Sequence, residues 1–590
     1  MKWRSCTVSM LFLALTLSSA TASAAAGEAK APAPAPSAAD GRLRVLYEAD
    51  WAWSMGEFGT IEDGEGGFTS ADYLPRVDVA TQQRRLGHWR DMLSKLNAIP
   101  ASQLSDAEQV NAAVFRTNLE ISIADARFRE WEMPFNSDSS FWTYLDRRSG
   151  LRTVEDYRRY IARMRDIPRF FDENIENMRA GLARGFSVPR ATLNGRDQSI
   201  ASYAESNVEK NPFYAAFATM PAAIPGSEQT ALREQARAAI STAVVPAYAK
   251  LAGFFRDEYV PKARTTLAAT ALPDGPEFYA AQIREYTTLG LSAEEVHKIG
   301  LSEVARIDSE MRQTMRDSGF KGSFEEFLHF LRTDPQFYAK TPEELLMVSA
   351  WVAKRVDGKI GETLGLLPRR RFTIRPVPDA IAPFYTAGRG GLEACQMNTY
   401  NLPSRPLYNI PALTLHECSP GHSLQAALAE EQKQGPAFRR NTYFSGYGEG
   451  WGLYTEWLGI GMGIYRTPYE NFGRLSYEMW RAARLVIDTG IHRYGWSREQ
   501  AIDYLAGHTA LSQHEVETEV DRYISWPGQA LAYKLGEMTI RRLRTEAETA
   551  LGPKFDQRKF HDAILALGSV PLPVLEERSR KFIEQERAAS

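Results

Sequence analysis

Apolar residues recur every three or four positions along most of the chain, with charged residues between them. This spacing places apolar side chains on one face of a helix. It is clearest in four segments: 157–177, 228–257, 292–318 and 342–364. Helical patterning resumes at Pro411 and continues toward the C-terminus. The pattern therefore predicts a mainly α protein.

Two short stretches interrupt the helical pattern. Residues 369–379 and 392–402 have β-branched or aromatic residues between Gly and Pro, which is typical of short strands. The sequence GRGG (388–391) lies between them, and neither a Lys-Ser/Thr nor a dinucleotide pattern follows it. It therefore predicts a turn between two strands rather than an anion-binding loop. Together these stretches predict a small β-sheet just before the next helix.

The first 24 residues resemble a cleaved secretory signal peptide. Two basic residues precede an apolar run (8–17), and small residues follow it. The run is too short to span a bilayer, and Cys6 precedes it, so neither a membrane anchor nor a lipoprotein is favoured. Residues 25–41 are rich in Pro and Ala and predict an extended linker. We expect an exported protein, periplasmic or secreted.

The folded body is expected to begin at residue 42. It should contain a helical N-terminal half, 42–270, and a helical catalytic half with the small sheet, 271–590. The formal charge is −3 and basic residues are scattered among acidic ones, which argues against a nucleic-acid-binding protein. After the signal peptide two cysteines remain, Cys395 and Cys418, and they could pair only if the fold brings them together.

The stretch HECSPGH contains two of the nine histidines in the chain. His416 and His422 are six residues apart, which separates them by about 120° around a regular helix. Pro420 and Gly421 lie between them and favour a break or bulge in the backbone. Such a distortion would let both imidazoles reach one metal ion. Glu449, between two glycines ahead of an aromatic-rich helix, is the candidate third ligand.

Catalytic zinc is usually held by two histidines and a carboxylate, with a fourth position for water. These residues therefore predict a site for one zinc ion. Glu417, directly after the first histidine, is the candidate general base that takes a proton from the attacking water. Glu456, close to the same helical face as Glu449, would be a partner of a ligand or a surface residue. A second His-Glu pair, 514–515, is not followed by a second ligand and predicts no metal site.

Four motifs occur in order: PALTLHECSPGHSLQ, GYGEGWGLY, DTGIHRYGWS and EVDRYISWPGQALAYKLGE. Together they resemble the bacterial DUF885 family over about residues 45–585. The resemblance implies a large multi-helical, metallopeptidase-like fold, with a small sheet and a zinc site similar in layout to that of gluzincin peptidases. It implies the same three ligands and the same base. Many relatives carry histidine where this chain has Ser423, so only His422 is available in this motif to partner His416.

Polar residues in the third and fourth motifs could complete the mechanism, as could residues near the second predicted strand. Candidates for stabilising the oxyanion are His492, Tyr523 and Tyr533. Candidates for holding substrate are Arg481, Arg484, Asn398, Tyr400 and Asn401. For the helical residues, a buried and self-satisfied polar contact is the alternative.

The sequence thus predicts an exported zinc metallopeptidase that hydrolyses short peptides with Glu417 as general base. Two alternatives stay open. One is a zinc hydrolase of another amide or ester; the other is a non-enzymatic exported binding protein with a degenerate metal motif. The expected partner is a peptide substrate, with no nucleic acid and no membrane anchor, and the oligomeric state stays open.

Overall fold

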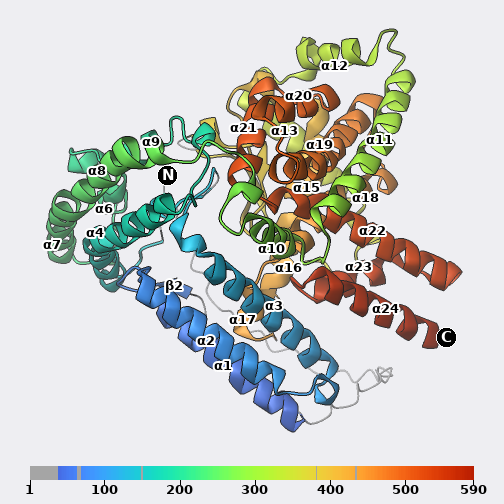
Figure 1. Cartoon of the computed structure of the whole chain (residues 1–590). Helices are drawn as coiled ribbons and strands as arrows, with labels where there is room; N and C mark the ends of the chain where they lie inside the picture. Colours follow the sequence, from blue (N-terminus) through green and yellow to red (C-terminus); the bar gives the residue numbers. More distant parts are fainter. Residues whose placement is uncertain are drawn as a thin grey trace, which may run out of the picture.

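The computed structural model describes most of the chain, namely residues 37–62, 68–137, 139–147, 150–379, 382–431 and 435–589. The predicted signal peptide and most of the predicted linker lie outside the described residues. The described chain is mainly helical (Figure 1), which confirms the predicted fold class at that level.

The first helix begins inside the predicted linker. α1 (Ala38–Glu57) is preceded by Ser37, whose hydroxyl accepts a hydrogen bond from the Asp40 N–H. The Asp40 carboxylate accepts one from the Ser37 N–H in return. This capping box satisfies donors that the helix start leaves unpaired. The start of the folded body predicted at residue 42 is therefore too late, because the capping signal was missed.

An N-terminal layer contains α1 with two further helices and an antiparallel hairpin. These are α2 (Val79–Asn97), α3 (Asp106–Phe128), β1 (Thr60–Glu62) and β2 (Phe68–Ser70). The three helices lie side by side in blue in Figure 1. Buried residues of this layer, such as Leu43 and Phe115, share one apolar cluster with Trp451 from the C-terminal region. The predicted division near residue 270 stays a prediction, but this packing joins the first three helices to the C-terminal half.

A second apolar cluster belongs entirely to the N-terminal region. Its helices are α4 (Val154–Ala183), α5 (Asp197–Ala201), α6 (Ala215–Ala218), α7 (Gly226–Ala239), α8 (Val245–Phe254) and α9 (Val260–Lys262). Two π-helical turns join α7, α8 and α9 into one continuous helix. It is the one helix in the described chain that is long and apolar enough to cross a membrane, yet its residues Ile240, Tyr248 and Leu251 are buried in this cluster. The predicted helices at 157–177 and 228–257 are confirmed.

The remaining helices form the C-terminal body (Figure 1). They are α10 (Gly275–Thr287), α11 (Ala293–Asp317), α12 (Phe324–Thr333), α13 (Pro342–Asp357), α14 (Ile360–Thr363), α15 (Ile410–Glu417), α16 (His422–Glu431), α17 (Ala437–Arg440), α18 (Ser445–Gly461), α19 (Pro468–His492), α20 (Arg498–His508), α21 (Gln513–Ser525), α22 (Ala532–Leu551), α23 (Gln557–Ala566) and α24 (Leu572–Ala588). From Phe472 onward α19 is buried on all sides, so it is the central helix. The predicted helix at 292–318 is confirmed. The segment at 342–364 instead breaks at Gly358, between α13 and α14.

A three-stranded sheet lies against α15. Its order is β3–β5–β4, with β3 (Thr373–Pro376) parallel and β4 (Gly388–Arg389) antiparallel to β5 (Ala394–Met397). The two predicted strands are confirmed, but GRGG is not simply a turn, because its first two residues form β4. β5, the strand whose edge was expected beside the metal helix, is the central strand and has no free edge. The edge strand in contact with α15 is β4.

A buried ion network joins α11, α19 and α22. The Lys534 ammonium is fully buried and lies 3.0 Å from Glu303, 2.9 Å from Glu478 and 2.8 Å from Glu537. Lys534→Met would remove the buried cation that the three carboxylates share and leave their charge to Arg306, Arg474 and Arg541 alone. We expect a loss of about 3–5 kcal/mol in the free energy of unfolding, read as a lower urea midpoint.

The matched control for this network is an exposed pair. Lys250 and Asp172 are both more than half exposed and 2.6 Å apart, so Lys250→Met should cost at most about 1 kcal/mol. Equal shifts of the urea midpoint in the two variants would contradict the role given to Lys534.

Candidate metal centre

The two histidines of the HECSPGH motif lie on either side of a helix break. α15 ends at Glu417 and α16 begins at His422. Between them, Cys418 has φ −100° and ψ −94°, which is outside the helical region. The predicted departure from a regular helix between Cys418 and His422 is confirmed.

Glycine is required within the break because the backbone folds back on α15. The Gly421 N–H donates to the Leu415 carbonyl at 3.0 Å. A Cβ atom on Gly421 would lie 1.9 Å from the His416 carbonyl oxygen, so a larger residue would force the two segments apart. Gly421 thereby allows the return of the chain that brings His422 beside His416.

His416, His422 and Glu449 converge. The Nε2 atoms of His416 and His422 lie 3.5 and 3.3 Å from the same carboxylate oxygen, Oε2 of Glu449. The two imidazole rings are nearly perpendicular, with centroids 4.8 Å apart. One ligand atom from each residue lies within 4.8 Å of the others. Glu449 comes from α18, just after its first turn, so three helices supply this cluster.

Glu456 fixes the orientation of His416. Its Oε1 atom lies 2.8 Å from Nδ1 of His416, on the opposite side of the ring from Glu449. The Glu456 side chain is 1% exposed, so the surface role left open by the sequence is wrong. A carboxylate on the second nitrogen is the usual way in which a metal-binding histidine is aligned and made more basic.

The charges within the cluster are strongly coupled. Burial alone would lower the pKa of His416, but hydrogen bonds to Glu449 and Glu456 outweigh it and raise the pKa to about 9. Burial would raise the pKa of Glu449, but the two histidines hold it well below its ordinary value. The carboxylate is therefore ionised at neutral pH. Two imidazole nitrogens and a carboxylate oxygen form the donor set of catalytic zinc sites, so these residues fit a zinc ion.

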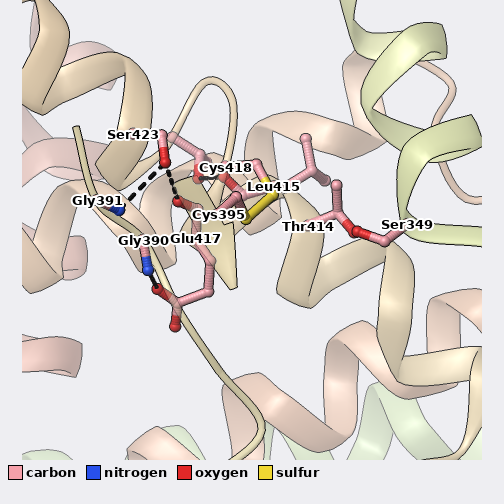
Figure 2. Close-up of a disulfide and its surroundings, with 10 residues drawn as sticks. Ser349, Gly390, Gly391, Cys395, Thr414, Leu415, Glu417, Cys418 and Ser423 are labelled. Carbon is pink, nitrogen blue, oxygen red and sulfur yellow. Dashed lines mark hydrogen bonds between the residues drawn. A yellow bond between two sulfur atoms is a disulfide. The ribbon is translucent and has the colours of Figure 1, made fainter. Parts of the chain in front are cut away.

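Glu417 lies beside the sheet. Its Oε2 atom accepts a hydrogen bond of 2.5 Å from the N–H of Gly390, the residue after β4 (Figure 2). The Ser423 hydroxyl accepts from the Gly391 N–H at 3.2 Å and donates to the Glu417 carbonyl at 3.1 Å. The sheet thus holds both the side chain and the backbone of Glu417.

Cys395 and Cys418 form a disulfide, with Cα atoms 5.2 Å apart (Figure 2). The pairing that the sequence left open is therefore present. The bond joins β5 to the break between the two histidines, and both cysteines are fully buried. A structural disulfide is consistent with an extracytoplasmic location.

Both ring nitrogens of His492 contact backbone groups. The Ala269 N–H donates to its Nδ1 at 3.0 Å, and its Nε2 lies 2.8 Å from the Tyr523 carbonyl oxygen. Burial lowers its pKa to about 3, so the ring is neutral. Both nitrogens are used by the backbone, and the catalytic role expected from the sequence is not supported.

Arg481, Arg484 and Tyr523 also form buried contacts behind the cluster. The Tyr523 hydroxyl accepts from Trp480 at 2.9 Å and from Nε of Arg484 at 3.0 Å. Arg484 also donates to Glu519. Arg481 lies 3.7 Å from Glu456, on the far side of His416 from Glu449. Tyr523 is thus held by buried protein contacts, whereas Nε of Arg481 and one terminal nitrogen of Arg484 are buried without a hydrogen-bond partner among the described residues. Substrate binding by Arg481 and Arg484 stays a prediction.

The residues expected beside the second strand fall into two groups. The Asn398 amide donates to three backbone carbonyls of residues 382–386 and is buried, so it holds that loop rather than substrate. Tyr400 is half exposed, and Asn401 donates to Ser404. Substrate binding by Tyr400 or Asn401 stays a prediction.

Two tyrosines lie at the cluster. The Tyr533 ring is nearly parallel to the His416 ring, with centroids 6.4 Å apart. The Tyr443 hydroxyl donates to Oε1 of Glu449 at 3.3 Å. Tyr443, six residues before the candidate ligand, was not among the residues expected from the sequence.

A second acidic group joins α3 to α10. Ligand oxygens of Asp125, Glu130 and Glu285 lie within 4.8 Å of one another. Burial, together with repulsion by Asp125, raises the pKa of Glu285 to about 8, and burial raises that of Asp125 to about 7. Acidic groups alone do not identify a metal site, but these pKa shifts do predict a pH dependence.

We expect the stability of the protein to fall as the pH rises from about 5 to about 8.5, in part because of Glu285. Between 4.5 and about 8 the folded state holds a proton on Glu285 that the unfolded chain has released. The free energy of unfolding therefore decreases with pH in this window. Glu285→Gln should show a smaller fall in Tm than the wild type. Glu277→Gln, an exposed change on the same helix, should follow the wild type, and identical profiles for all three would contradict the assignment.

Residues 55–578 match the family described as "Bacterial protein of unknown function (DUF885)". A solved structure from Colwellia psychrerythraea, described as a putative lipoprotein, has 26% identity and a TM-score of 0.84, covering 93% of this chain and 100% of its own. A second, from Shewanella oneidensis and described as a putative lipoprotein of unknown function, has 17% identity and a TM-score of 0.63, covering 91% and 98%. No curated protein is similar enough to this chain to count as a match. The description of the first structure and the disulfide are consistent with export.

Proposed function

We propose that this chain, which belongs to the DUF885 family, is an exported zinc-dependent peptidase acting on short peptides. The family description assigns no activity, so the proposal rests on the site. The observation that carries the proposal is the convergence of His416, His422 and Glu449 beside Glu417. His416, His422 and Glu449 would hold the ion. When bound, zinc supplies the Lewis acidity that makes water a nucleophile at neutral pH and polarises a carbonyl group.

Glu417 would act as the general base. Its position directly after the first ligand keeps its carboxylate close to the cluster, and the Gly390 N–H fixes one of its oxygens. The other oxygen can take a proton from the attacking water and deliver it to the leaving amine. The same group therefore serves both proton transfers of amide hydrolysis.

Glu456 would keep His416 in the form that binds metal. A ligand histidine must present an unprotonated Nε2, so its single proton has to reside on Nδ1. The carboxylate of Glu456, 2.8 Å from Nδ1, would accept a hydrogen bond from this N–H and so favour the tautomer that binds metal. Metal binding would therefore release the second proton that His416 carries at neutral pH.

Peptides are favoured as substrates because an extended chain could lie along the edge of β4. Gly388 lies opposite Met397 of β5. The neighbouring pair, Ala387 and Asn398, is hydrogen-bonded, because the Asn398 N–H donates to the Ala387 carbonyl. Since hydrogen-bonded and non-hydrogen-bonded pairs alternate in an antiparallel ladder, Gly388 and Met397 form a non-hydrogen-bonded pair. The backbone groups of Gly388 therefore point away from β5, on the same side as the Gly390 N–H that holds Glu417. Pairing of substrate with this edge would bring a peptide bond beside the base.

The proposal is tested by metal analysis and a peptide library. Protein purified with its disulfide intact should contain one zinc ion per chain by mass spectrometry. It should cleave members of a mixed short-peptide library, and a chelator should abolish the cleavage. Absence of zinc would exclude a zinc enzyme. Zinc without peptide cleavage, but with hydrolysis of a panel of other amides and esters, would move the assignment to a non-peptide substrate.

A further inference from the structure

Tyr443 is fixed in place although its side chain is exposed. It lies in the short segment between α17 and α18. On one side Thr442 accepts a hydrogen bond from Asn118 at 3.0 Å, and on the other the Phe444 N–H donates to Ser569 at 2.8 Å. Phe444 itself is buried. The residues on both sides of Tyr443 are therefore held by distant parts of the chain, Thr442 through its hydroxyl and Phe444 through its backbone N–H.

The ring of Tyr443 lies directly on Gly448 in the first turn of α18. A Cβ atom on Gly448 would come within 2.3 Å of both the ring and the hydroxyl oxygen. Only glycine therefore leaves room for this ring next to Glu449. The contact explains one of the glycines in the GYGEGWG motif by a close approach rather than by backbone conformation.

The two oxygens of Glu449 face different partners. Oε2 lies 3.3 to 3.5 Å from the two histidines, and Oε1 accepts from the Tyr443 hydroxyl at 3.3 Å. Tyr443 is 57% exposed, whereas the His416 side chain is 2% and the His422 side chain 18% exposed. The hydroxyl thus lies at the solvent side of the ligand cluster, the side from which a substrate must arrive.

The other candidate hydroxyls are less well placed. Tyr523 is fully buried and bonded to Trp480 and Arg484. Tyr533 is 7% exposed, and the guanidinium of Arg484 stacks 4.3 Å from its ring centroid. Among these three tyrosines, the hydroxyl bonded to a candidate ligand is that of Tyr443.

We propose that Tyr443 is a catalytic residue whose hydroxyl, exchanging its bond to Glu449, donates a hydrogen bond to the carbonyl oxygen of the scissile amide as that oxygen gains negative charge. The inference rests on the proposed peptidase function. No proton leaves the phenol, and no bond to the protein forms. A preorganised donor aimed at developing charge contributes about 10²–10³ in kcat.

The test is Tyr443→Phe, which keeps the ring on Gly448 and removes only the hydroxyl. We expect kcat on the best library peptide to fall by about 10²–10³-fold, with little change in KM. The zinc content and zinc Kd should equal those of the wild type. Tyr494→Phe, a change at a half-exposed tyrosine on another part of the surface, is the control and should not change any of these values.

A second measurement does not depend on turnover. A phosphinic peptide carries a tetrahedral, negatively charged oxygen in place of the scissile amide, whereas a reduced-amide peptide lacks that oxygen. Calorimetry should show that Tyr443→Phe weakens binding of the phosphinic peptide by about 10²–10³-fold, the size of the kcat effect. Binding of the reduced-amide peptide should be unchanged.

The outcomes separate this inference from the proposed function. Wild-type kcat and phosphinic affinity in Tyr443→Phe, with Glu417→Gln inactive, would overturn the role of Tyr443 and leave the peptidase in place. Loss of zinc from Tyr443→Phe would also overturn it, because the hydroxyl would then serve Glu449. A wild-type protein without peptide cleavage would overturn both.

Discussion

Glu417→Gln is expected to lower kcat for peptide hydrolysis by about 10²–10⁴-fold, the range for a lost general base. The amide oxygen of glutamine can still accept the hydrogen bond from the Gly390 N–H. The side chain should therefore stay in place while losing the ability to take a proton. Single-turnover assays on a library peptide that the wild type cleaves would measure the loss of rate. The zinc content of the same sample would show that the metal is still bound.

The control for Glu417→Gln is Glu393→Gln. Glu393 lies just before β5, its side chain is 75% exposed, and its partner is Arg370. The same chemical change at this position should leave kcat unchanged. A Glu417→Gln variant that contains zinc and turns over at the wild-type rate would exclude Glu417 as the base.

The second large effect is expected on zinc affinity. Substitution of Glu449 should weaken it more than substitution of Glu456. Glu449→Ala removes a ligand, and Glu456→Gln only weakens the alignment of His416. Loss of the hydrogen-bond partner of a ligand typically costs about 10–100-fold in metal affinity, and loss of a ligand should exceed that range. Competition with a chromophoric zinc chelator would measure both dissociation constants.

The order of these two effects is the critical result. Glu449→Ala should bind zinc more weakly than Glu456→Gln, and both more weakly than Glu393→Gln. If Glu456→Gln had the larger effect, Glu456 would be the ligand and Glu449 its partner. Unchanged affinity in both variants would place the zinc elsewhere.

The parts of the site that could be predicted were those determined by neighbours in sequence. His416 and His422 are separated by Pro420 and Gly421, so the helix break could be anticipated from backbone preferences alone. The small sheet could be expected because β-branched residues between Gly and Pro stand out from a helical background. The order of its strands could not, because β4 has two residues and no pattern of its own.

The sequence was least informative about residues whose partners are far away along the chain. His492 matched the pattern of a catalytic histidine, but Ala269 and Tyr523 use both of its nitrogens. Asn398 was expected to bind substrate and instead holds a loop of backbone carbonyls. Tyr443 was overlooked because its importance depends on Gly448, and a glycine in a helix does not reveal what packs against it.

The disulfide implies an order of maturation. Cys418 directly follows Glu417 and begins the break before His422, so the Cys395–Cys418 bond ties the start of that break to β5. That bond forms in oxidising compartments and is rare in the cytosol. The break between the two histidines would therefore be fixed only after export. A metal ion bound there would then come from the supply outside the cytosol. Protein produced in a reducing cytosol would consequently be the wrong material in which to measure metal selectivity.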